Sequence, residues 1–198
     1  EVNNMKSKNN LKVLLVSNNK YGEGLADLFG ANYITEQLYN YFKCIVLNPD
    51  EDVVFLKDKN HTNTIDEIFD FIEKIHEDCI FLFYFCGHGK MDSHNISELI
   101  MALKDTTSQN FDSIGIKFSD IVHKVKKENI TKFICVVDSC CSGIINSHMG
   151  ENELTFNESD CNDGTVYISS VKGTLNAYEI EINGKKVPCF SYSFLKAL

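Results

Sequence analysis

The sequence predicts one domain with an α/β fold, in which a mostly parallel central sheet lies between two layers of helices. Segments with the patterns of strands and helices alternate along the chain. Two segments, 79–85 and 133–137, are continuously apolar, which is typical of parallel strands covered on both faces. The length of 198 residues suffices for one sizeable core. We therefore expect a three-layer α/β/α sandwich over residues 11–198, with residues 1–10 as a flanking segment.

The first part of the chain supplies two strands and two helices of the expected sandwich. Leu11–Ser17 is a short apolar run of strand type, and Val53–Leu56 is a second one. Between them, residues 25–42 carry apolar side chains at broadly helical spacing. Thr64 and Glu67 have the spacing of a capping box, which predicts a helix start at Thr64. The apolar stripe that follows consists of Ile65, Ile68, Phe69, Ile72 and Ile75.

The second part continues the alternation. Residues 118–125 place apolar side chains on one helical face, between the two buried strands. Thr165–Ser169 is a further strand candidate. Asn183-Gly184 is the signal of a tight turn, so residues 178–182 and 185–190 should form a hairpin. The last residues have the pattern of a helix that is still running, and the first residue is Glu rather than Met, so we expect a processed or excised domain.

Composition excludes several classes of protein. A net charge of -9 disfavours nucleic-acid binding, which needs clustered positive charge. No apolar run approaches the roughly 18 residues of a membrane span. All 19 basic residues are Lys, so no guanidinium is present to hold a carboxylate or phosphate through two parallel hydrogen bonds. The eight cysteines are scattered through apolar segments, and the adjacent pair Cys140 and Cys141 cannot easily bridge. This distribution favours a reducing, cytoplasmic setting without a disulfide framework or a zinc site.

Reactive side chains follow both of the most buried strands. In an open α/β sheet, ligands bind beyond the carboxyl ends of the strands. His88 lies between Gly87 and Gly89 after the first of these strands, where the backbone can turn sharply and present its amides to a substrate oxygen. Cys140 follows the second strand, and an imidazole could activate its thiol. The two residues are 52 positions apart, which agrees with the spacing of about 50 known for caspases.

These two motifs, YFCGHG at residues 84–89 and VVDSCCSG at residues 136–143, resemble those of the caspase-like cysteine peptidases, and more closely their metacaspase and paracaspase branches. The resemblance extends over nearly all of residues 11–198, through the order of the elements. It implies a caspase-like fold and a cysteine endopeptidase with a Cys-His dyad. His88 matches the catalytic histidine and Cys140 the nucleophile, with the backbone amides of Gly89 and Cys140 stabilising the oxyanion.

The resemblance also suggests which residue precedes the cleaved bond. Asp138 matches the pocket acid two residues before the nucleophile, Glu179 resembles the acid that paracaspases supply from a later loop, and Asp27 is the nearest candidate for a third. Converging carboxylates would bind Arg or Lys. Two alternatives stay open: a catalytically latent or inactive caspase-like scaffold, and an Asp-specific peptidase, which the absence of Arg disfavours.

Cofactors and partners follow from the same comparison. Calcium-dependent metacaspases use clustered aspartates, whereas Asp105, Asp112 and Asp120 are separated in this sequence, so no cofactor is expected, and calcium stays open as the alternative. The expected partners are protein substrates, together with other domains or an activating partner. Neither nucleic acid nor a membrane is expected as a partner.

Overall fold

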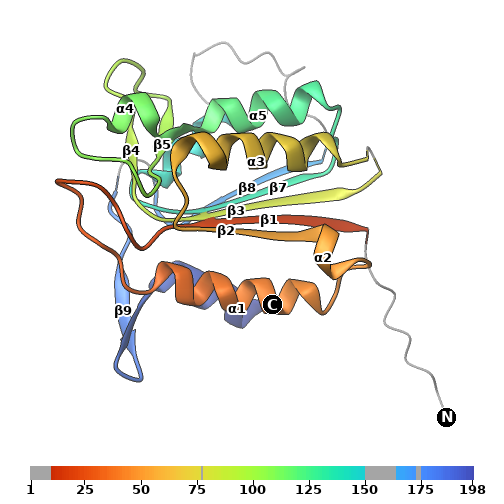
Figure 1. Cartoon of the computed structure of the whole chain (residues 1–198), viewed down its shortest axis with the longest axis horizontal. Coiled ribbons are helices and arrows are strands. Elements are labelled where there is room, and N and C mark those ends of the chain that lie inside the picture. Colours follow the sequence, from red (N-terminus) through yellow and green to blue (C-terminus); the bar gives the residue numbers. More distant parts are fainter. Residues whose placement is uncertain (1–9, 77, 150–163, 173–174) are drawn as a thin grey trace.

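The computed structural model describes residues 10–76, 78–149, 164–172 and 175–198, and it confirms an α/β fold in three layers (Figure 1). Its central sheet has five parallel strands in the order β2-β1-β3-β7-β8. All five strands were predicted from the sequence, with ends that differ by one residue at most. They are β1 (Leu11–Ser17), β2 (Val53–Lys57), β3 (Ile80–Cys86), β7 (Phe133–Asp138) and β8 (Thr165–Ser169).

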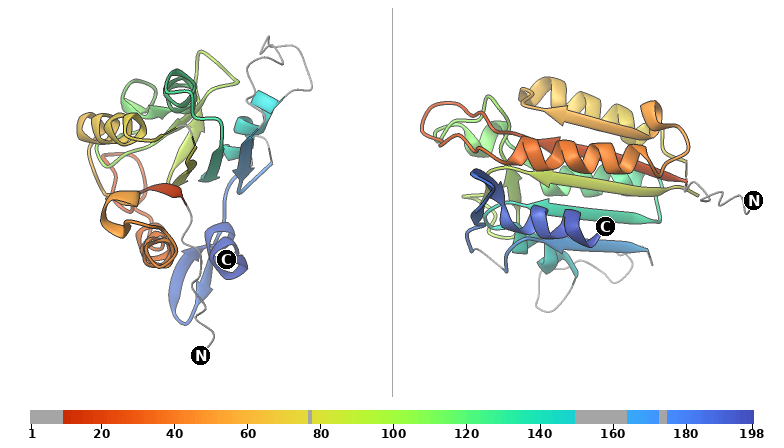
Figure 2. Two further views of the ribbon diagram at one scale, coloured as in Figure 1. Left: turned by 90° about the vertical axis from the view of Figure 1, so that its right-hand side faces the viewer. Right: turned by 90° about the horizontal axis from the view of Figure 1, so that it is seen from below.

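Helices cover both faces of the sheet (Figures 1 and 2). One face packs against α1 (Ala31–Lys43) and α6 (Cys189–Ala197), and the other packs against α3 (His61–Glu73) and α5 (Phe118–Lys127). A short helix, α2 (Pro49–Asp52), leads into β2.

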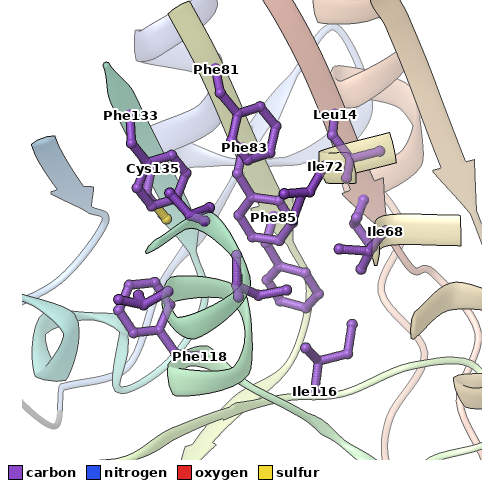
Figure 3. Close-up of a cluster of buried hydrophobic side chains, with 14 of the residues drawn as sticks. Leu14, Ile68, Ile72, Phe81, Phe83, Phe85, Ile116, Phe118, Phe133 and Cys135 are labelled. Carbon is purple, nitrogen blue, oxygen red and sulfur yellow. The ribbon is translucent and has the colours of Figure 1, made fainter. Parts of the chain in front are cut away.

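Strand β3 shows why its run of apolar residues is continuous. Phe81, Phe83 and Phe85 lie in the core beneath α3 and α5, where Figure 3 shows them beside Phe133 and Ile72. The alternate residues of β3 lie in the core on the other face, beneath α1 and α6. Because successive side chains of a strand point to opposite faces, a central strand needs apolar residues at every position.

The predicted start of α3 at Thr64 is wrong. The helix begins at His61, and the Thr64 hydroxyl donates to the carbonyl oxygen of Asn60 inside the first turn. The backbone N–H of His61 is capped by the carboxylate of Asp105, at 2.9 Å, from a distant loop. Glu67 pairs with Lys59. A tertiary contact therefore replaces the local capping box.

Helix α1 begins at Ala31, six residues later than the apolar spacing suggested. Residues 25–30 form a loop instead, in which the backbone N–H of Leu28 donates to the carbonyl oxygen of Asn19. Gly30 stands at the helix start because a Cβ atom there would lie 2.2 Å from the carbonyl oxygen of Lys186. The loop is thereby held against the strand that carries Lys186.

Two further groups of elements lie at the carboxyl end of the sheet. A small antiparallel sheet of β4, β5 and β6 was not predicted, and neither was the short helix α4. The hairpin of β9 and β10 was predicted, with its turn at Asn183-Gly184. No helix among the described residues is long and apolar enough to span a membrane. The bounds are β4 (Gly89–Met91), β5 (Leu99–Met101), α4 (Phe111–Ile114), β6 (Ile116–Lys117), the 3-10 helix η1 (Ser142–Met149), β9 (Glu179–Ile182) and β10 (Lys185–Pro188).

Candidate active site

The ends of β3 and β7 bring the predicted histidine and cysteine to one cavity. The two strands are adjacent and parallel, and the Cα atom of Cys86 pairs with that of Asp138. His88 and Cys140 each follow their strand's paired residue by two positions, so they leave the sheet at the same edge. Both line a cavity of about 250 Å³, and both are partly exposed. The structure thus brings together the two residues that the sequence placed at neighbouring strand ends.

Gly89 lets the two loops approach closely. A Cβ atom at this position would lie 2.4 Å from the Ser139 hydroxyl oxygen and 2.8 Å from the carbonyl oxygen of Cys140. Real Cβ atoms do not come so near, so a glycine is required here for the segment after His88 to pass against the turn that carries Cys140. The close approach places the backbone of Gly89 beside that of Cys140, the two residues predicted to supply the oxyanion amides.

The imidazole of His88 is oriented by a backbone carbonyl. Its Nε2 atom lies 2.7 Å from the carbonyl oxygen of Ala26, an acceptor that requires a proton on Nε2. In the neutral ring this leaves Nδ1 as the basic nitrogen. The loop before α1 therefore selects the tautomer in which Nδ1 is the nitrogen that can accept a proton.

Tyr21 holds the histidine from a second side. Its ring lies against the imidazole with the centroids 4.5 Å apart, and its hydroxyl accepts a hydrogen bond of 3.0 Å from the His88 backbone N–H. The same hydroxyl donates to the carbonyl oxygen of Asn18, at 2.8 Å. Burial raises the pKa of Tyr21, so the phenol stays neutral and keeps its proton for Asn18. Tyr21 is a positioning residue that the sequence reasoning did not identify.

For the peptidase activity that the sequence predicts, replacing Tyr21 with phenylalanine should lower kcat while leaving KM nearly unchanged. The ring contact with His88 remains, but both hydrogen bonds of the hydroxyl are lost, so the backbone that carries the imidazole is less restrained. Each lost neutral hydrogen bond is worth about 1 kcal/mol, and we expect kcat to fall by roughly three- to tenfold. Steady-state kinetics on a fluorogenic peptide measure the effect. An unchanged kcat, or a rise in KM alone, would contradict this role.

Two carboxylates line the same cavity. Asp138 is 3% exposed at the end of β7, and it accepts hydrogen bonds from the backbone N–H and the hydroxyl of Ser191 on α6, at 3.0 and 2.5 Å. Burial raises the pKa of Asp138, against these hydrogen bonds, which lower it. Glu179, at the start of β9, is exposed at the cavity's edge. Asp138 is therefore the buried acid of this cavity, and Glu179 is the exposed one.

Asp27 does not join them. Its carboxylate pairs with Lys20 at 2.6 Å and also accepts a hydrogen bond from the backbone N–H of Tyr21. The described residues that line the cavity do not include Asp27. Its contacts instead stabilise the loop whose Ala26 carbonyl orients His88.

The comparison with family models identifies the family of this chain, and the comparison with solved structures supports its fold. A model of the caspase domain matches residues 11–198. The chain belongs to the caspase domain family. The crystal structure of caspase-1 from Spodoptera frugiperda has a similar fold, with a TM-score of 0.65 and 12% sequence identity over 96% of this chain and 68% of that chain. No curated protein matches the chain.

This caspase domain has a second thiol in its cavity that the sequence analysis did not use. Cys86 is buried at the end of β3, and its pKa is raised by burial and by the charges of Asp138 and Glu179. The effect of both carboxylates on one thiol is consistent with their position around the same space. The Ser191 hydroxyl contacts Cys86 at 3.8 Å and Tyr84 at 2.6 Å, which joins α6 to the floor of the cavity.

Two of the three aspartates considered for calcium have other contacts in the caspase domain. Asp105 caps α3, and Asp112 pairs with Lys90 and accepts a hydrogen bond from Ser93. Within the described ranges, no group of three or more His, Cys, Asp or Glu side chains is arranged to hold a metal ion.

Proposed function

We propose that this caspase domain is a catalytically competent cysteine endopeptidase of the metacaspase and paracaspase type, which cleaves proteins after Arg or Lys. The observation that carries the proposal is the shared cavity, which holds His88 and Cys140 together with the carboxylates of Asp138 and Glu179. A nucleophile, a base and two anions are the groups that this reaction needs.

The proposed chemistry uses Nδ1 of His88 as the base, because the Ala26 carbonyl accepts from Nε2. His88 Nδ1 accepts the proton of the Cys140 thiol, and the thiolate attacks the carbonyl carbon of the scissile bond. The backbone amides of Gly89 and Cys140 donate to the resulting oxyanion. The imidazolium then gives its proton to the departing amine, which leaves an acyl-enzyme. Water attacks the thioester with His88 as general base, which releases the acid and restores the thiol.

The cavity favours a basic residue before the scissile bond. Leu28, Ala177 and Pro188 supply apolar surface for the methylene stem of Lys or Arg. Asp138 and Glu179 supply negative charge for its cationic end. No lysine lines this cavity in the described part of the chain, so an aspartate side chain would meet two like charges without a cation.

Peptides that differ only in the residue before the cleaved bond test the specificity. We expect hydrolysis after Arg and Lys, and hydrolysis after Asp slower by at least about 100-fold, since a like charge beside a buried carboxylate costs several kcal/mol. The measurement is kcat/KM on fluorogenic peptides. Faster cleavage after Asp would contradict the proposed specificity. An inactive protein whose Cys140 also resists an arginyl chloromethylketone would favour the scaffold alternative.

A further inference from the structure

A second cavity, of about 540 Å³, lies on the two segments that also build the candidate active site. Leu28 and Pro188 line the active-site cavity, whereas Phe29 and Lys186 line the second one. The two segments are in direct contact at Gly30 and Lys186. Figure 1 shows the hairpin that contains β9 beside the N-terminal end of α1. A chain bound in the first cavity therefore passes close to the second.

The second cavity combines exposed aromatic rings with lysines. Phe29 is 68% exposed and Tyr33 is 43% exposed, so both rings are accessible to a ligand. The Nζ atom of Lys185 lies 4.5 Å from the centroid of Tyr33, and that of Lys186 lies 5.9 Å from the centroid of Phe29. Each ring thus holds an ammonium group near its face, which restrains two otherwise flexible side chains.

These ammonium groups have no carboxylate partner among the described residues. Eight other lysines of the described part form ion pairs, but neither Lys185 nor Lys186 does. Glu181 is opposite Lys186 in the hairpin register, and yet no ion pair joins them. In a chain with a net charge of -9, this leaves a local positive site.

We propose that this cavity, which we call the lysine subsite (Phe29, Tyr33, Gly184, Lys185 and Lys186), binds a glutamate or aspartate side chain of the protein substrate. The carboxylate lies between the two ammonium groups, and the side-chain methylenes contact the rings. The proposal rests on the proposed function, because the same substrate places its basic residue in the active-site cavity. The preferred substrate then carries a cation and an anion close together.

Because the protein is acidic overall, the direction in which an added glutamate changes the cleavage rate is informative. A domain with a net charge of -9 and two carboxylates at its active site repels an acidic peptide. Without a local cation site, an added glutamate should slow cleavage or leave it unchanged. A gain from glutamate therefore requires a site that outweighs the general repulsion.

Matched peptides test the lysine subsite. Each pair has Arg before the scissile bond and either Glu or Gln at one other position, scanned over four residues before and three after that bond. For one position, we expect wild-type kcat/KM to favour Glu by about fivefold, the size of a favourable exposed ion pair. The preference should disappear in Lys185→Gln/Lys186→Gln. The preference should persist in Lys74→Gln/Lys127→Gln, which removes two exposed lysines, one directly after α3 and one at the end of α5, on the other side of the sheet.

Binding to the Cys140→Ala protein gives a readout that does not depend on turnover. Fluorescence anisotropy with the same labelled peptides should show tighter binding of the Glu peptide, and the difference should vanish when Lys185→Gln/Lys186→Gln is added. Cleavage after Arg without any Glu preference would overturn the lysine subsite and leave the proposed function intact. If no peptide is cleaved, equal binding of the Glu and Gln peptides overturns the subsite, and a lysine-dependent Glu preference supports it.

Discussion

Replacing Cys140 with alanine is expected to abolish peptide hydrolysis while leaving the fold intact. Loss of the nucleophile in comparable hydrolases lowers kcat by several orders of magnitude, and we expect a fall of at least about 10⁴-fold. Cys140 is partly exposed and lies in the turn after β7, so the smaller side chain creates no buried void. Circular dichroism and the thermal midpoint should therefore match those of the wild-type protein. Kinetics on an Arg peptide measure the loss.

Cys141 provides the matched control, because it is the adjacent thiol. Its backbone N–H donates to the carbonyl oxygen of Leu175 at 2.9 Å, and burial raises the pKa of its thiol. A raised pKa lowers the fraction of thiolate, so burial makes Cys141 less reactive than an ordinary thiol. We expect Cys141→Ala to retain activity and Cys140 alone to be alkylated by an arginyl chloromethylketone in peptide mapping. Activity in Cys140→Ala, or its loss only in Cys141→Ala, would contradict the assignment.

The sequence was sufficient for the main sheet because its strands are long, apolar and bounded by polar segments. Strand β3 is seven residues long, and six of these are buried. The small sheet was not predictable in this way, since its strands have only two or three residues and show no periodicity. Those strands form because the segments after β3 and before α5 meet at the edge of the molecule, which is a tertiary effect.

The meeting of His88 and Cys140 could be predicted for a topological reason. Adjacent parallel strands end at the same carboxyl edge of the sheet. Residues two positions beyond the paired ends therefore lie close to that edge, independently of the conformation of the later loop residues. The loop before α1 had no such constraint. There the pairing of Asp27 with Lys20 decides where the carboxylate lies, and neither that contact nor that of Tyr21 with His88 has a periodic signal. The contacts of residues in this irregular loop therefore could not be predicted from the sequence.

Replacing Asp138 with asparagine should separate substrate binding from stability. The amide oxygen of asparagine can still accept both hydrogen bonds from Ser191, but the negative charge is removed. Loss of one partner of a buried charge pair costs about 2–5 kcal/mol, so we expect kcat/KM for Arg and Lys peptides to fall by roughly 100-fold or more. Glu179→Gln, at the hydrated edge, is the matched variant and should cost much less.

Asp138→Asn should increase the stability of the fold, although it weakens substrate binding. Burial raises the pKa of Asp138 in the folded state above that of an unfolded aspartate, so the fold favours the neutral acid. The associated stabilisation is complete below the unfolded pKa of about 3.9 and is lost as the pH rises through the folded pKa. At pH 7, above the unfolded pKa, the burial of this acid therefore destabilises the fold, and Asp138→Asn should raise the thermal midpoint by a few degrees, at roughly 2–4 °C per kcal/mol. The gain should shrink as the pH falls toward 4. A lower midpoint at pH 7, with Glu179→Gln unchanged, would show that the Asp138 carboxylate stabilises the fold and would contradict this account.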